Sequence, residues 1–271
     1  MRATTSLIRR EFSAYFLSPV AYVVLAIFLF TTGYLFHLTL QQLTARGPHG
    51  IEYPMQLLLG SQSYVAGRLE DWRYLVGFLT FWLVFLSIPP LLTMRLFAEE
   101  RSTGTLEMLM TAPLRDWQVV LSKYLACYAF YLVLWLPTLL YVPALIGWNW
   151  SERTAGIDPF PVLTSYLGIA LAGGMFLALG LLVSSLVKSQ LVAFLVSLFL
   201  SMGFVIVGFW QSMLSEDQLL GRLMAYFSVP AHFDRDFSRG IIDTGHLVLY
   251  VSVALFCLFL TVRSVESRRW R

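Results

Sequence analysis

Long apolar runs alternate with short polar segments along the chain. The apolar runs cover residues 20–40, 74–94, 124–147, 162–187, 191–210 and 246–262. An α-helix needs about 20 apolar residues to cross the hydrocarbon core of a bilayer. The pattern predicts an all-α polytopic membrane protein, with six transmembrane helices in a single domain over residues 1–271.

Residues 4–17 have a different pattern. Apolar side chains share one helical face: Leu7, Ile8, Phe12, Tyr15 and Phe16. Arg9, Arg10 and Ser13 lie on the opposite face. Such a helix lies along a membrane surface, and Pro19 then suits the start of the first span, where its missing N–H costs least. The alternative is a frayed extension of that span.

A polar stretch at residues 95–123 separates the second and third spans. Thr103 or Gly104 can cap a new helix there, and Glu107 then falls in its first turn, where a negative charge interacts favourably with the helix dipole. Apolar side chains share one face of this helix: Leu106, Leu109 and Met110. Pro113 ends it. This short surface helix either docks on another protein or only connects two spans along the lipid headgroups.

The composition supports the membrane assignment. Of the 271 residues, 58% are hydrophobic and 13% are charged, whereas soluble domains have about 25% charged residues. The length leaves no room for a separate soluble enzyme domain, and the formal charge of +3 is too small to indicate nucleic-acid binding. Cys127 and Cys257 fall in apolar spans, where we expect buried thiols rather than a disulfide.

The distribution of Lys and Arg predicts the orientation. Six spans put both termini on one side of the membrane, and the segments on that side carry 12 of the 19 basic residues. They are Arg2, Arg9, Arg10, Arg95, Arg101, Arg115, Lys123, Lys188, Arg263, Arg268, Arg269 and Arg271. Because basic residues are enriched in cytoplasmic loops, we expect both termini and residues 95–123 to be cytoplasmic.

The spans carry little of the chemistry that drives transport or catalysis. They contain no Asp, Glu, Arg or Lys apart from Lys123 at a boundary. This argues against a secondary transporter, because such carriers couple through intramembrane charges. The sequence also has no P-loop, HExxH, CxxC or GxSxG motif. We expect no enzyme activity and no catalytic, cofactor-binding or metal-binding residues in this chain.

Small residues recur at intervals of four in the fourth span. They are Ala170, Gly174 and Ala178, and then Gly180 and Ser184. Such spacing lets helix backbones approach closely. The contact lies either within the subunit or at a dimer seam, and we favour the first.

The segment at residues 211–245, before the last span, combines an apolar helical face with chain breaks. The face consists of Leu219, Leu220, Leu223, Met224 and Phe227. Gly221, Pro230 and Gly240 supply the breaks.

Three segments resemble type-2 ABC transporter permeases. Residues Glu99–Glu107 read EERSTGTLE and precede an apolar run and Pro113, which is similar to the signature of that family. Arg10-Glu11-Phe12 and residues Tyr15–Tyr22 resemble the branch of gliding-motility and nitrous-oxide-reductase-accessory permeases, and so does the segment His232–Asp243. The resemblance covers essentially the whole chain.

The resemblance implies a permease subunit driven by a separate ABC ATPase, which holds the ATP and Mg. The loop between the second and third spans is then a coupling helix that contacts the ATPase through Glu99, Glu100, Arg101, Thr103, Gly104, Thr105, Leu106, Glu107, Leu109 and Met110. The interfacial helix contributes Arg9, Arg10, Glu11 and Phe12. Two six-helix permeases pair in this family, so we expect a second copy of the chain or a homologous permease as partner.

The resemblance also bears on the segment before the last span. In this family it often forms a broken, re-entrant pair of short helices on the outer side of the membrane. We expect an outer gate there, formed by Pro230, His232, Phe233, Phe237, Gly240 and Asp243. The alternative is a folded surface loop without a gating role.

Two functions are compatible with this resemblance. The first is an ATP-driven exporter in the inner membrane of a bacterium. The second is a membrane anchor or mechanotransmitter, which passes the work of the ATPase to an accessory protein on the outer side without moving a solute. The apolar and aromatic spans suit either a hydrophobic solute or simple contact with lipid, so the sequence does not name a substrate.

Overall fold

The computed structural model describes residues 2–46, 72–102, 104, 115–143, 159–211 and 219–269, and these are folded into helices joined by short turns. Six of the helices in these ranges are long and apolar enough to cross a membrane. They are α2 (Pro19–Arg46), α4 (Trp72–Thr93), α7 (Asp116–Trp135), α9 (Pro159–Leu186), α10 (Gln190–Gln211) and α13 (Thr244–Arg269). The predicted all-α architecture with six spans is confirmed.

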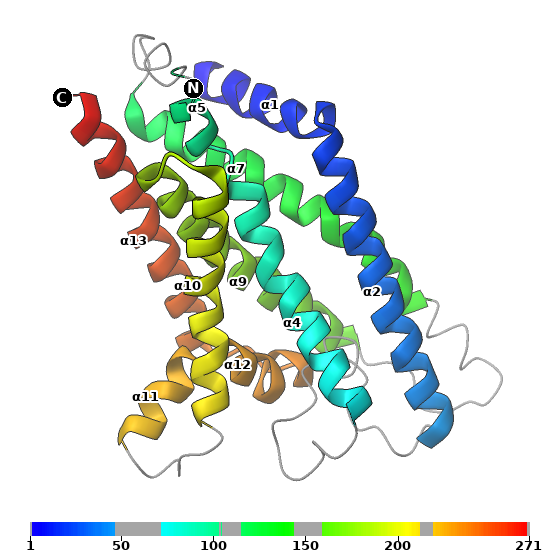
Figure 1. Cartoon of the computed structure of the whole chain (residues 1–271). Coiled ribbons are helices and arrows are strands. Elements are labelled where there is room, and N and C mark those ends of the chain that lie inside the picture. The colour runs from blue at the N-terminus through cyan, green and yellow to red at the C-terminus, as the bar shows by residue number, and fades with distance from the viewer. Residues whose placement is uncertain are drawn as a thin grey trace.

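The shorter helices lie at the two ends of the bundle. Figure 1 shows α1 (Arg2–Leu17) and α5 (Ala98–Ser102) at the end where both chain termini lie. At the opposite end are α11 (Leu219–Phe227) and α12 (Val229–Arg235). We call the end with the termini the proximal end and the other the distal end.

Helix α9 forms the centre of the bundle. Of the residues in its spanning part, 72% are buried inside the protein, against 22% for α10 and for α13. Small residues make this possible, because a side chain at Gly173 would overlap the Tyr131 ring and one at Gly180 would overlap Thr93. A Cβ at Gly174 would lie 3.1 Å from the Tyr128 ring. The small residues therefore pack α9 against α4 and α7 within the subunit.

Prolines interrupt two of the spans. Pro89 and Pro90 lie inside α4, and the Thr93 hydroxyl donates a hydrogen bond of 2.8 Å to the carbonyl oxygen of Pro89. At Pro137, α7 gives way to a 3-10 helix, η2 (Leu136–Leu140). Membrane helices tolerate such breaks where side chains and 3-10 turns satisfy the freed backbone groups.

Helix α7 begins at Asp116, well before Tyr124, where the apolar run starts. The backbone N–H of Arg115 donates to the side-chain oxygen of Gln118 at 3.2 Å, and Asp116 lies in the first turn, where its charge is favourable. Lys123 consequently lies inside a helix and is buried, although the sequence suggests a polar boundary. Its charge is tolerated because two carboxylates from other helices lie beside it.

Candidate functional site

At the proximal end, the corner between α4 and α5 closes around Ser184, near the end of α9. The Ser184 hydroxyl accepts hydrogen bonds from the backbone N–H groups of Phe97 and Ala98, both at 3.2 Å. It donates to the carbonyl oxygen of Met94, also at 3.2 Å. Phe97, Ala98 and Ser184 are buried, and a buried N–H left without a partner costs about 1–3 kcal/mol. One side chain of α9 thus fixes the turn that leads out of the second span.

Arg101 forms a second contact between α5 and the end of α9. Its guanidinium donates to the carbonyl oxygens of Ser185 at 3.1 Å and Val187 at 2.9 Å. Carbonyls at the end of a helix have no partner within that helix, and a cation there also interacts favourably with the helix dipole. Arg101 therefore satisfies the end of α9 and anchors α5 in the same contact.

Lys123 of α7 joins α1 to α5. Its ammonium nitrogen lies 2.6 Å from Oε1 of Glu100 in α5 and 3.5 Å from Oε2 of Glu11 in α1. The Lys123 side chain is only 3% exposed, and the nitrogen lies 5.6 Å from the centre of the Phe97 ring. Three segments that are far apart in the sequence therefore meet at one buried cation.

The C-terminal half of α1 is held by aromatic contacts. The Tyr15 ring stacks on Phe130 of α7 with centroids 5.0 Å apart, and Phe16 meets the same ring edge-on at 5.4 Å. The Tyr15 hydroxyl donates to the carbonyl oxygen of Leu92 in α4 at 3.2 Å. Helix α1 therefore has an aromatic attachment near its end and an ionic one at Glu11.

At the distal end, the carbonyl oxygen of Phe237 binds two hydroxyl groups of α9. Phe237 lies in a short 3-10 helix, η3 (Phe237–Arg239), which follows α12. Its oxygen accepts hydrogen bonds from the hydroxyls of Thr164 at 2.6 Å and Ser165 at 3.2 Å. The ring packs so closely on Gly168 that a Cβ there would come within 2.9 Å of it. Residues 228–243, which we call the distal segment, are therefore fixed to the start of α9.

A second distal contact pairs two histidines. The His232 and His246 rings stack with centroids 3.7 Å apart. His232 Nε2 lies 3.2 Å from the carbonyl oxygen of Ala225, which can only accept, so Nδ1 accepts the hydrogen bond from the Tyr250 hydroxyl at 2.8 Å. Burial, and then the nearby charge of His246, lowers the pKa of His232 to about 3. His232 is therefore a neutral structural group. His246 Nε2 contacts Asp236 at 2.8 Å.

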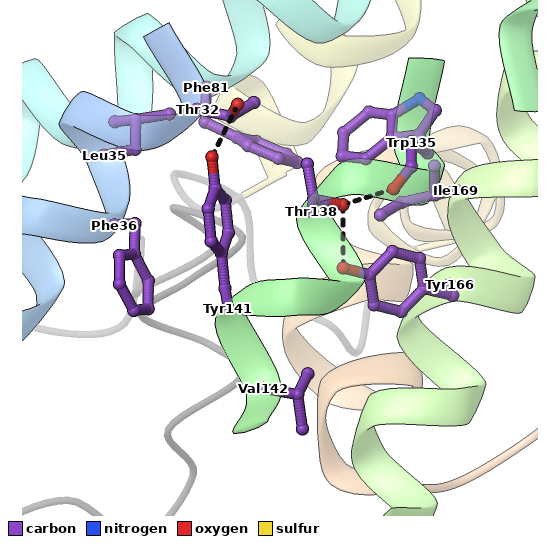
Figure 2. Close-up of a pocket in the computed structure, with 10 residues that line it drawn as sticks. All are labelled: Thr32, Leu35, Phe36, Phe81, Trp135, Thr138, Tyr141, Val142, Tyr166 and Ile169. Carbon is purple, nitrogen blue, oxygen red and sulfur yellow. Dashed lines mark hydrogen bonds between the residues drawn. The ribbon is translucent and has the colours of Figure 1, made fainter. Parts of the chain in front are cut away.

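A small pocket lies between α2, α4, η2 and α9 (Figure 2). Thr32 donates to the carbonyl oxygen of Phe28 at 2.9 Å, so the Tyr141 hydroxyl donates to Thr32, at 3.3 Å. In the same way, Thr138 donates to the carbonyl oxygen of Trp135 at 2.6 Å, so it accepts from the Tyr166 hydroxyl at 2.8 Å. The volume of about 40 Å³ suits one or a few water molecules. The pocket is too small to be a passage for a larger solute.

These features belong to a known class of membrane protein. The model of a family described as ABC-2 family transporter protein matches residues 59–231, more than half of the chain. The chain belongs to the ABC-2 transporter family. No curated protein matches the sequence. The matched part of this permease includes the corner around Ser184, Lys123 and the whole of α9. Membership confirms the predicted type of permease, a multi-pass membrane subunit that works with an ABC ATPase and in a dimeric arrangement.

Part of the predicted coupling site of the permease can be located. Glu100 and Arg101 lie in α5 and make the contacts given above, while Glu99 is exposed beside them. Gly104 is exposed and has φ of +74°, a left-handed conformation that favours glycine. Six further predicted residues lie outside the described residues: Thr103, Thr105, Leu106, Glu107, Leu109 and Met110. The coupling helix itself therefore stays a prediction.

The predicted interfacial residues of the permease divide into two groups. Arg9 and Arg10 are exposed. Glu11 and Phe12 are partly buried, with Glu11 beside Lys123 and the Phe12 ring 5.1 Å from that of Phe16. The amphipathic pattern of α1 thus separates side chains that face the bundle from those that face outward.

Most of the predicted gate residues are buried in the protein. Phe233 and Phe237 are fully buried, and Trp82 of α4 meets Phe233 edge-on at 5.8 Å. Pro230 lies at the start of α12, where Ser228 caps the helix. Gly240, with φ of +85°, ends η3, while Asp243 is exposed and accepts a hydrogen bond from the backbone N–H of Gly245 at 2.8 Å. The structure thus shows an anchored segment, and gating stays a prediction.

Two residues that organise the proximal end were not among the predicted site residues. Ser184 appeared only as a small packing residue, and Lys123 only as a charge at a boundary. A signal for Lys123 exists, because Val119, Val120 and Cys127 make its face of α7 apolar and buried. A lone cation on such a face requires carboxylate partners from elsewhere in the fold.

Proposed function

We propose that this permease is the membrane subunit of an ATP-driven exporter, and that its ATPase docks on the loop that follows α5. The observation that carries the proposal is the attachment of α5 to α9 through Arg101 and Ser184. A force on the loop then acts on a buried corner of the bundle rather than on a free linker. The predicted contact residues are those around Gly104 and Glu107.

The same proposal assigns the proximal end to the cytoplasm of a bacterial cell, with the chain in the inner membrane. Among the described residues, five exposed basic residues belong to segments that end there, against three in the distal helices. The five are Arg9, Arg10, Arg115, Lys188 and Arg263, and the three are Arg222, Arg235 and Arg239. This distribution supports the assignment, because basic side chains are retained on the cytoplasmic side. Both termini are then cytoplasmic.

We further propose that the distal segment acts as an outer gate and that it moves with α9. Its support is the pair of hydrogen bonds from Thr164 and Ser165 to Phe237. Because α9 also holds the α4–α5 corner, one helix connects the region of ATPase docking to the region of the gate. The pairing partner in the membrane is a second copy of the chain or a homologous permease, which would provide the other wall of a pathway.

The alternative function is a mechanotransmitter for an accessory protein on the outer side. It is favoured by exposed apolar side chains at the distal end, on α11 and beside α13: Leu219, Leu223, Phe227, Ile241 and Ile242.

ATP-dependent uptake into inverted vesicles that contain the permease and its ATPase separates the two functions. Uptake would support the exporter, and ATPase stimulation without uptake would support the mechanotransmitter. Glu107→Arg and Gly104→Pro should both abolish stimulation, the latter because proline cannot adopt φ of +74°. Glu266→Arg, in the partly exposed ion pair with Arg263 on α13, is the control. Unchanged stimulation in both loop variants would exclude docking on this loop.

A further inference from the structure

Lys123 lies between two carboxylates of unequal closeness. Glu100 Oε1 is 2.6 Å from the ammonium nitrogen, whereas both oxygens of Glu11 are 3.5 Å away. The three side chains are 3%, 22% and 14% exposed for Lys123, Glu100 and Glu11. Charges this far from water interact strongly and are little screened by salt. The tight pair joins α7 to α5, and the looser one adds α1.

The looser pair is in a position to transmit movement to α1. The aromatic attachment of α1, through Tyr15 and Phe16, reaches Phe130 and Leu92 in the membrane-spanning helices. The ionic attachment reaches the cation that also binds Glu100 of α5. Movement of α5 therefore acts on the same ammonium group that holds the middle of α1.

We propose that Lys123 is a positioning residue that makes the interfacial helix α1 follow the base of the coupling loop. Glu100 fixes the cation to α5. Glu11 pairs α1 with the same cation, so that α1 moves when α5 moves. This inference rests on the proposed function, because it assumes that the ATPase acts on the loop after α5. Its direct consequence, a fixed distance between α1 and α5, does not depend on the ATPase.

Spin labels at Ser13 of α1 and Glu99 of α5, both exposed, report this distance in the permease in lipid nanodiscs. Cys127 and Cys257 are buried and stay in place. We expect a narrow distance distribution in the wild type and in Lys123→Arg, which keeps the charge. Lys123→Met and Glu11→Gln should broaden it. Glu266→Gln, in an exposed ion pair of α13, is the matched control.

The second readout is the ATPase activity of the complete complex. We expect Glu11→Gln to lower the stimulation by the permease roughly 2- to 30-fold, the range of typical coupling changes, and Glu266→Gln to leave it unchanged. Glu11→Gln is the decisive variant, because it leaves Lys123 paired with Glu100 and spares the fold, whereas Lys123→Met brings two uncompensated carboxylates together.

The outcomes can be told apart. A distribution as narrow in Glu11→Gln and Lys123→Met as in the wild type would overturn the proposal, and so would equal broadening in Glu266→Gln. Broadening with unchanged stimulation would show that α1 is held by Lys123 but takes no part in coupling, which also overturns it. A wild-type permease that never stimulates an ATPase would contradict the proposed function, while the distances would still test the attachment of α1.

Discussion

Gly173 shows how little space individual residues have at the centre of the bundle. A Cβ at this position would overlap the ring of Tyr131. The ring cannot easily move, because Tyr131 is fully buried and its hydroxyl donates to the carbonyl oxygen of Ile169 at 3.2 Å. The approach of α7 to α9 therefore depends on one missing methyl group.

This contact leads to a stability prediction. Gly173→Ala should lower the free energy of unfolding by about 1–3 kcal/mol, the usual cost of overpacking. Gly203→Ala in α10 is the control, because nothing lies within 4 Å of a Cβ there, and it should be neutral or stabilising by up to about 1 kcal/mol. Thermal unfolding in nanodiscs measures both. Equal shifts would mean that the contact with Tyr131 relaxes without cost.

The lowered pKa of His232 predicts that stability depends on pH. Its pKa is lowered to about 3 by burial and by His246, whereas an ordinary histidine has a pKa of about 6.5. Between these values the unfolded chain binds a proton that the folded protein does not. The contribution of His232 to the free energy of unfolding is therefore fully present above about pH 6.5. It falls as the pH drops, by up to about 1.4 kcal/mol per pH unit.

His232→Gln should flatten this dependence, since glutamine does not titrate. The midpoint of thermal unfolding, measured from pH 7.5 down to 5, should fall less steeply in this variant than in the wild type. An unchanged slope in His232→Gln would show that other groups cause the acid sensitivity.

Among the elements, the α4–α5 corner shows what a single hydroxyl contributes. Ser184→Ala leaves the buried N–H groups of Phe97 and Ala98 without their acceptor, and should destabilise the permease by about 1–3 kcal/mol. Ser197→Ala is a matched control, because Ser197 is equally buried but donates only within its own helix, to Ala193 and Phe194. Unfolding midpoints should differ clearly between the two variants.

If Ser184→Ala shifted the midpoint no more than Ser197→Ala, the corner would have to be held by Arg101 instead. The ATPase activity of the complex adds a further test of the same element. A loosened corner should reduce stimulation in Ser184→Ala and not in Ser197→Ala.

Most elements could be predicted from the sequence, because length and apolar content alone determine a membrane span. The orientation of the elements could not. In α11, the apolar residues Leu219 and Leu223 are exposed, while Gly221 is buried. In water an apolar face turns toward the protein, but in a bilayer lipid solvates it equally well. The amphipathic pattern therefore predicts the helix without showing which side contacts the bundle.

The cluster of Lys123, Glu11 and Glu100 at the proximal end was predictable only in part, for a related reason. Glu11 and Glu100 were singled out through resemblance to a family, and Lys123 through its position at a boundary. Nothing in the spacing of these residues shows that they meet, since α1 packs on α7 and α5 packs on α9 and α10, which are contacts between segments far apart in the sequence. Buried ion pairs between distant segments become visible once the tertiary structure is known.

The whole molecule makes a prediction about topology. Lys188 in the turn between α9 and α10 and Ile242 before α13 are both exposed, at the proximal and distal ends respectively. A membrane-impermeant thiol reagent should label Lys188→Cys in inverted vesicles and Ile242→Cys in intact cells stripped of their outer membrane. Cys127 and Cys257 are buried, so they add little background. The reverse pattern would place both termini outside the cell.

Helix α9 connects the two ends of the molecule without a break. It has 28 residues, so it is about 42 Å long at 1.5 Å per residue. It binds Phe237 near its beginning and the α4–α5 corner near its end. A straight rod that tilts about its midpoint moves its ends in opposite directions, and a tilt of about 10° displaces each end of such a helix by about 4 Å. A push that narrows the bundle on one face of the membrane would therefore widen it on the other.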